Sequence, residues 1–112
     1  MNKDLREQVK IMIGLLVQQS YWQIEQWTKG VRLPANQIEN AIDGYGKTLC
    51  VPPEKAYELM DIIEIENSKH QKWSVNMPLW TLEEGRSDLT VELSIAKVDC
   101  DYYVELDDIH VL

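Results

Sequence analysis

The chain has 112 residues, of which 45% are hydrophobic and 27% charged, and its formal net charge is −8. This composition is that of one globular domain rather than a disordered tail, and no run reaches the about 18 consecutive apolar residues of a membrane span. The first ten residues, MNKDLREQVK, are charged and helical in pattern, unlike a signal peptide, so we expect a cytoplasmic protein.

The amino-terminal third predicts an amphipathic helix. Leu5, Val9, Met12 and Leu16 recur at helical spacing within residues 4–18. Gly14 either weakens this helix by up to about 1 kcal/mol relative to Ala or allows another element to approach closely.

Two further helices are expected before residue 47. Ser20 followed by Gln23 has the spacing of a capping box, and Gly30 stops the helix that it opens. Pro34 suits the first turn of a third helix, which the sequence DGYG ends at residues 43–46.

After a short helical turn at residues 54–59, the pattern changes from helical to alternating. The segment DIIEIE predicts a strand with Ile63 and Ile65 facing inward and its two glutamates facing outward. A second strand follows over Trp73, Val75 and Met77 until Pro78, where an edge position or a bulge is expected. The clearest strand has alternating apolar residues at Leu89, Val91, Leu93 and Ile95.

The last strand has a break in its alternation. Two apolar sets fall on opposite faces, namely Tyr102, Val104 and Leu106 on one and Ile109 and Val111 on the other. An extra residue at Asp107–Asp108, a β-bulge, would bring both sets into the core.

These elements predict an α+β fold in a single domain, with a helical part at residues 1–46 and a sheet part at residues 60–112. Two or three amino-terminal helices would pack on one face of a four-stranded, mostly antiparallel β-meander. The other face would be acidic and solvated, and would carry Glu64, Glu66, Glu92, Glu105 and Asp107.

The negative charge is concentrated in the second half of the chain. Residues 1–50 hold six basic and five acidic side chains, whereas residues 51–112 hold five and fourteen. Such a field repels nucleic acid and anionic membranes, and it speeds encounter with a basic protein. The alternative is that the acidity serves only solubility.

No assembled active site or cofactor motif is recognisable, so we expect neither catalysis nor a cofactor. Asp107, Asp108 and His110 are the nearest approach to a metal cluster, but only Asp108 and His110 would share a strand face. Without His70 or another ligand nearby, two ligands do not make a site. The two cysteines, Cys50 and Cys100, have no C-x-x-C spacing and are expected to be free, buried thiols.

Trp80 is the expected anchor of an interaction surface. It follows Pro78 and precedes the acidic turn that holds Glu83, Glu84 and Asp88, so it should lie off the core register and be partly exposed. An aromatic ring with a carboxylate rim is typical of a binding interface, whereas a ring lying flat over a bulge is the structural alternative. Arg86 would neutralise the neighbouring acidic groups.

Two stretches, PLWTLEEGRSDLTVEL and the terminal VELDDIHVL, resemble a family of small uncharacterised bacterial domains with no established activity. In size, acidity and order of helices and strands, the chain is also similar to the immunity proteins of contact-dependent growth inhibition systems. That second resemblance implies a protein that binds and blocks a cognate toxin, often a basic nuclease.

We therefore expect a non-enzymatic inhibitor that binds a basic protein, such as a toxin domain, and neither nucleic acid nor membrane. The expected contact residues are Trp80, Glu83, Glu84, Arg86, Asp88, Glu92, Asp99, Asp101, Glu105, Asp107 and Asp108. The alternative is an α+β cone that binds or converts a small molecule in an aromatic-lined pocket between sheet and helices.

Overall fold

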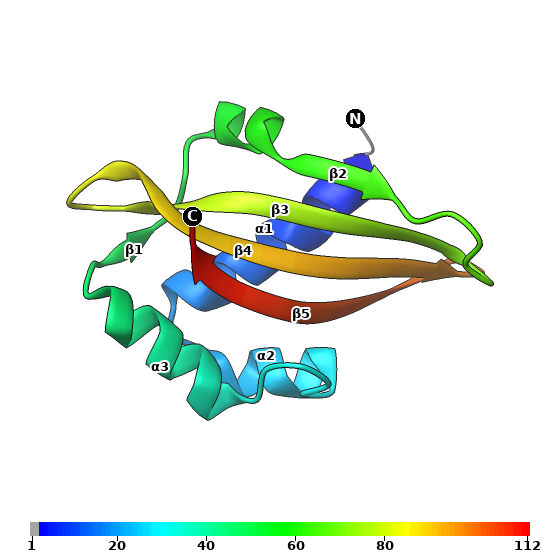
Figure 1. Cartoon of the computed structure of the whole chain (residues 1–112), viewed down its shortest axis with the longest axis horizontal. Helices are drawn as coiled ribbons and strands as arrows, with labels where there is room; N and C mark the ends of the chain where they lie inside the picture. The colour runs from blue at the N-terminus through cyan, green and yellow to red at the C-terminus, as the bar shows by residue number, and fades with distance from the viewer. Residues whose placement is uncertain (1–2) are drawn as a thin grey trace.

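The computed structural model describes residues 3–112 of the chain (Figure 1). Its elements in chain order are α1 (Lys3–Val17), α2 (Tyr21–Thr28), α3 (Ala35–Tyr45), β1 (Leu49–Cys50), the 3-10 helix η1 (Glu54–Leu59), β2 (Asp61–Glu64), β3 (Gln71–Thr81), β4 (Gly85–Val98) and β5 (Asp101–Val111). No helix within this range is long and apolar enough to cross a membrane.

The predicted α+β architecture is confirmed. Strands β2, β3, β4 and β5 form an antiparallel meander, and the two-residue β1 pairs with the far end of β3 on the same edge as β2. Figure 1 shows α1 crossing behind the sheet, while α2 and α3 lie together beside β5. One face of the sheet therefore carries the helices and the core.

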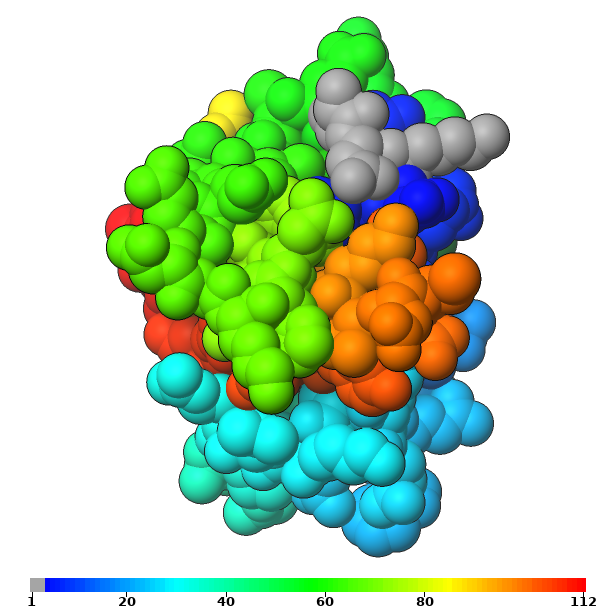
Figure 2. All heavy atoms as spheres, turned by 90° about the vertical axis from the view of Figure 1, so that its right-hand side faces the viewer, coloured from blue at the N-terminus to red at the C-terminus, as the bar shows by residue number. Residues whose placement is uncertain are grey.

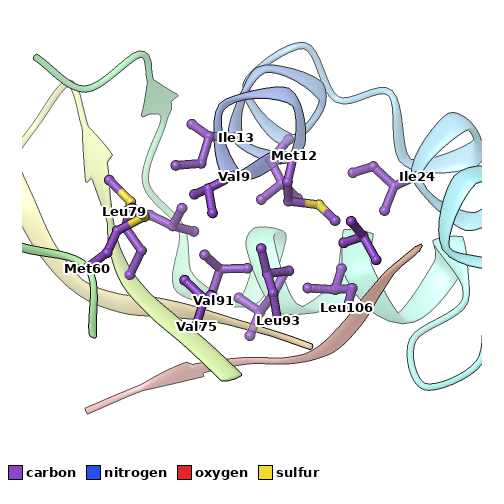
Figure 3. Packing of buried hydrophobic residues seen from close by; sticks show 14 of the residues in the cluster. Val9, Met12, Ile13, Ile24, Met60, Val75, Leu79, Val91, Leu93 and Leu106 are labelled. Carbon is purple, nitrogen blue, oxygen red and sulfur yellow. The ribbon is translucent and has the colours of Figure 1, made fainter. Parts of the chain in front are cut away.

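The core is an aliphatic layer between α1 and the sheet. Val9 and Met12 of α1 point toward Val91 and Leu93 of β4 (Figure 3), and none of these four side chains is exposed. Gly14 does not serve a close approach, because a Cβ at this position would meet nothing within 4 Å.

The ends of the helices differ in part from the sequence expectation. Ser20 stands at the N-cap of α2, but its side chain makes no capping hydrogen bond, so the expected capping box is wrong. Helix α3, in contrast, has a side-chain acceptor at its start. The Ala35 N–H donates a hydrogen bond to Oε1 of Glu25 in α2 at 2.7 Å. This carboxylate satisfies one of the unpaired N–H groups at the start of the helix. Gly46, with φ of +78°, ends α3 as expected.

The face assignment in β2 is the clearest correction. Ile62, not Ile63, is the partner of the buried Val75 and packs against the core. Ile63 is instead 59% exposed and Ile65 37% exposed. Glu64 is the partner of Trp73 and so belongs to the helix side of the sheet rather than to the acidic face.

Both expected irregularities are present in the sheet. The β3–β4 register shifts between Pro78 and Trp80. On β5, Leu93 pairs with Leu106 and Glu92 with Asp108, so Asp107 is the extra residue of a bulge. As a result Ile109 is buried beyond the bulge, as the break in alternation predicted, although Val111 is 58% exposed.

The cysteines are free, as expected, but they are not buried thiols: Cys50 is half-buried and Cys100 is exposed in the β4–β5 turn.

Candidate functional site

The sheet face that turns away from α1 is polar, and we call it the open face. Within residues 3–112 no helix crosses it in the view of Figure 1. Strand register and burial assign to it Asp61, Ile63, Lys72, Ser74, Asn76, Pro78, Thr90, Glu92, Ser94, Ala96, Tyr103, Glu105, Asp108 and His110.

One row of side chains on the open face crosses the whole meander. Asp61 of β2 is the partner of Asn76 of β3, Asn76 is the partner of Glu92 of β4, and Glu92 is the partner of Asp108 of β5. Since neighbouring strands lie about 4.8 Å apart, three carboxylates and one amide follow one another across the sheet. We call these four residues the acidic row.

His110 lies beside the end of the acidic row on β5. Its Nδ1 is 3.2 Å from Asp108 Oδ2, and these two side chains and Glu92 each offer a ligand atom within 4.8 Å of the others. The third group that the sequence interpretation lacked is therefore Glu92, on the neighbouring strand.

Two large apolar side chains stand on the other side of the acidic row. Ile63 and Tyr103 are 59% and 56% exposed, one on each outer strand of the meander. Glu105, two residues after Tyr103 on β5, is the partner of Ser94 on β4. The open face thus combines exposed apolar area with carboxylates.

A hollow of ≈ 400 Å³ borders the acidic row near the C-terminal end of β5. Its lining comprises Leu59, Asp61, Asn76, Pro78, Arg86, Ser87, Asp88, Thr90 and Leu112. Two of the expected contact residues, Arg86 and Asp88, therefore lie at the margin of the open face, and both are exposed.

Glu83 and Glu84 are exposed but already have partners within the chain. The N–H and the hydroxyl of Thr48 donate to the Glu83 carboxylate at 2.9 and 3.0 Å, and the backbone donor lowers the pKa of Glu83. The hydroxyls of Tyr45 and Thr81 donate to Glu84 Oε1 at 2.9 and 3.1 Å. The two carboxylates thus connect the β3–β4 turn to the end of α3 and to the segment that follows it.

Asp99 and Asp101 lie at the opposite end of the sheet from Glu83 and Glu84. Figure 2 shows the β4–β5 turn in orange beside the light green loop between β2 and β3. The expected contact residues therefore form no single patch.

Asp107 is less accessible than expected, and Trp80 is partly exposed as expected but is not clear of the core. The Asp107 side chain is 12% exposed, accepts a 2.5 Å hydrogen bond from the Ser94 hydroxyl and lies 3.9 Å from Arg32 Nε. Trp80 is half-buried and packs against the core, whereas Trp22 on α2 is 64% exposed. The exposed ring on the open face belongs to Tyr103.

The sequence interpretation missed Asp61, Asn76, Ile63 and Tyr103 as members of this face. For Ile63 the inverted alternation in β2 was the cause. Asp61 and Asn76 were missed because each is an isolated polar residue in its own strand. Only the register between the strands aligns them with Glu92.

The pocket of ≈ 310 Å³ near the ends of α1 and α3 does not match the expected aromatic-lined cone. It is lined by Leu16, Val17, Gln19, Tyr21, Ile42, Asp43, Gly46, Lys47, Thr48 and Leu49, among which Tyr21 is the sole aromatic residue. Side chains of the core fill the layer between α1 and the sheet (Figure 3).

Comparison with curated proteins and comparison with solved structures gave no match. A family model described as a domain of unknown function, DUF7668, matches residues 13–112. The match includes the C-terminal end of α1 and all later elements, and it agrees with the resemblance to an uncharacterised domain family. The chain therefore belongs to the DUF7668 domain family.

Proposed function

We propose that this protein is a non-enzymatic inhibitor that binds a basic protein partner through its open face. The observation that carries the proposal is the acidic row, which aligns Asp61, Glu92 and Asp108 on three of the four strands of an uncovered meander, with Asn76 on the fourth. Like charges directly opposite one another destabilise a sheet, as Glu92 and Asp108 do here, so their alignment favours a surface that is selected for a ligand rather than for stability.

The open face has both components of a protein interface. Tyr103 and Ile63 supply exposed apolar area, and an aromatic side chain that is covered on binding is a frequent hot spot. The carboxylates orient the partner and raise the association rate. Perpendicular to its shortest axis the molecule measures 40 × 29 Å, which is wide enough for the about 800 Å² that each partner commonly buries.

The specific form of the proposal is an immunity protein that blocks a cognate bacterial toxin in the cytoplasm. The acidic row would occupy the position that phosphates take in the active site of a basic nuclease, so inhibition would be by occlusion. The net charge of −8 and the resemblance in character to immunity proteins support this form.

The test uses the purified product of the neighbouring gene and measures binding by calorimetry at 50 and 300 mM salt. We expect binding that weakens several-fold at the higher salt, since the Debye length shortens with ionic strength. We also expect Tyr103→Ala to weaken binding at least about tenfold, the range of a hot spot. Trp22→Ala, which removes an exposed ring from α2, is the matched control and should change binding less than about twofold.

Binding that is insensitive to salt, or that depends on Trp22 and not on Tyr103, would contradict the open face as the contact surface. The absence of binding to the neighbouring product would refute the immunity form.

A further inference from the structure

We propose that Glu92, Asp108 and His110 form a binding site for a divalent first-row transition-metal ion such as Zn²⁺. This site goes beyond the proposed function, because it requires no protein partner and is tested on the chain alone.

The bulge at Asp107 creates the site. In a regular strand, Asp108 and His110 would lie on the same face as the buried Leu106, because side chains alternate. The extra residue moves both side chains to the open face, where Asp108 becomes the partner of Glu92. A nitrogen donor and two carboxylates thus meet on two rigid adjacent strands.

One distance between the potential ligand atoms already suits a small ion. Ligands about 2.1 Å from a metal, at angles between those of octahedral and tetrahedral coordination, lie about 3.0 to 3.4 Å apart. His110 Nδ1 and Asp108 Oδ2 are 3.2 Å apart, and Glu92 has a carboxylate oxygen within 4.8 Å of one potential ligand atom of each of these two residues. A rotamer adjustment of Glu92 would complete the set.

The second observation is the unsatisfied nitrogen of His110. The His110 side chain is 33% exposed, but its Nδ1 atom is shielded from solvent and makes no hydrogen bond within residues 3–112, although it lies 3.2 Å from Asp108 Oδ2. Buried polar atoms nearly always make a hydrogen bond, so this imidazole nitrogen is a position that an added ligand would satisfy. A metal ion would take the lone pair of this nitrogen.

The ligand types select the class of ion. Carboxylates alone suit Mg²⁺ and Ca²⁺, whereas an imidazole nitrogen favours Zn²⁺, Ni²⁺, Co²⁺ or Cu²⁺. The Asp108 side chain is 54% exposed, so water has access to the remaining coordination positions.

The experiment titrates the full chain with Zn²⁺ and, separately, with Mg²⁺, using calorimetry and nitrogen-15 spectra of the imidazole rings. The chain contains two histidines, so His70→Gln assigns the signals of His110 without ambiguity. The titration is repeated in a Cys50→Ser/Cys100→Ser background to remove thiol ligands. We expect one Zn²⁺ per chain in both backgrounds, a shift of the His110 signals, and no comparable binding of Mg²⁺.

Glu92→Gln, Asp108→Asn and His110→Gln should each weaken Zn²⁺ binding at least about tenfold. His70→Gln and Glu105→Gln, the latter on the same face but outside the cluster, should change it less than about twofold. Thermal unfolding of each variant without metal is the control that checks whether the variant is folded. The proposal is wrong if no Zn²⁺ binds, if any of the three substitutions leaves the affinity unchanged, if binding depends on His70, or if Mg²⁺ binds as tightly.

Discussion

Glu92 of β4 and Asp108 of β5 lie directly opposite each other on the open face, at the residue where the bulge in β5 ends. Two carboxylates in this position repel each other, and a basic group or a cation placed between them would relieve the repulsion. The fold therefore keeps two like charges adjacent on its uncovered sheet face, between β4 and the edge strand β5.

Neutralising one member of this pair should stabilise the isolated chain. We expect Glu92→Gln to raise the free energy of unfolding by about 0.2 to 1 kcal/mol in low salt, measured by urea denaturation. Glu105→Gln is the matched control, because Glu105 faces Ser94 rather than a carboxylate, and it should give no such gain. A loss of stability in Glu92→Gln would show that the pair is not repulsive.

The side-chain orientation in β2 can be tested with two neighbouring isoleucines. Ile62→Ala should reduce the free energy of unfolding by about 1 to 3 kcal/mol, because Ile62 packs against the core beside Val75. Ile63→Ala should change it by less than about 0.5 kcal/mol, because Ile63 is 59% exposed. Equal losses of unfolding free energy in the two variants, or a larger loss for Ile63→Ala, would support the inward orientation of Ile63 that the sequence predicted.

These isoleucines also show where sequence patterns are sufficient and where they are not. The segment IIEI allows either Ile62 or the pair Ile63 and Ile65 to face inward, and only the pairing with β3 decides between them. The bulge at Asp107 was predictable, because the buried sets on its two sides have opposite parity and both must reach one core.

Asp107 should contribute to stability through its contacts rather than to recognition. Asp107→Ala removes the acceptor of the Ser94 hydroxyl and the carboxylate near Arg32, so we expect a loss of about 1 to 3 kcal/mol in the free energy of unfolding. Asp101→Ala, at the exposed start of β5, should change it by less than about 0.5 kcal/mol. If the two variants are equally stable, Asp107 does not hold the bulge.

The Glu83 carboxylate predicts a specific dependence of stability on pH. Its pKa is lowered from the ordinary value of 4.5, chiefly by the N–H of Thr48. Its contribution is therefore present above about pH 4.5 and is lost as the pH falls through the lowered pKa of the folded state. Thermal unfolding should show wild type more stable than Glu83→Gln at pH 7, with the difference shrinking in acid.

Glu66→Gln, on the exposed loop between β2 and β3, is the control for the same pair of thermal scans. A difference between wild type and Glu83→Gln that stays constant from neutral to acidic pH would mean that the ionised carboxylate is not the stabilising form.

The binding surface was less predictable than the fold. The charge distribution identified the acidic half of the chain. No local sequence pattern, however, predicted that Glu83 and Glu84 accept hydrogen bonds that hold a turn. The acidic row depends on register between strands that are up to 47 positions apart, from Asp61 to Asp108. Local sequence therefore predicted that the surface is acidic, but not which carboxylates lie next to one another across the strands.

We propose that the position of the carboxylates, and not the total charge, determines partner binding. The direct measurement compares two double variants that each change the net charge of −8 by the same two units. Glu92→Gln/Asp108→Asn alters the open face, and Glu39→Gln/Asp43→Asn alters exposed positions on α3. Calorimetry at 50 mM salt measures the affinity of each for the basic product of the neighbouring gene.

We predict that the open-face variant binds at least about tenfold more weakly than wild type, and that the α3 variant binds within about twofold of it. Equal weakening in both variants, or a larger effect from α3, would contradict the claim.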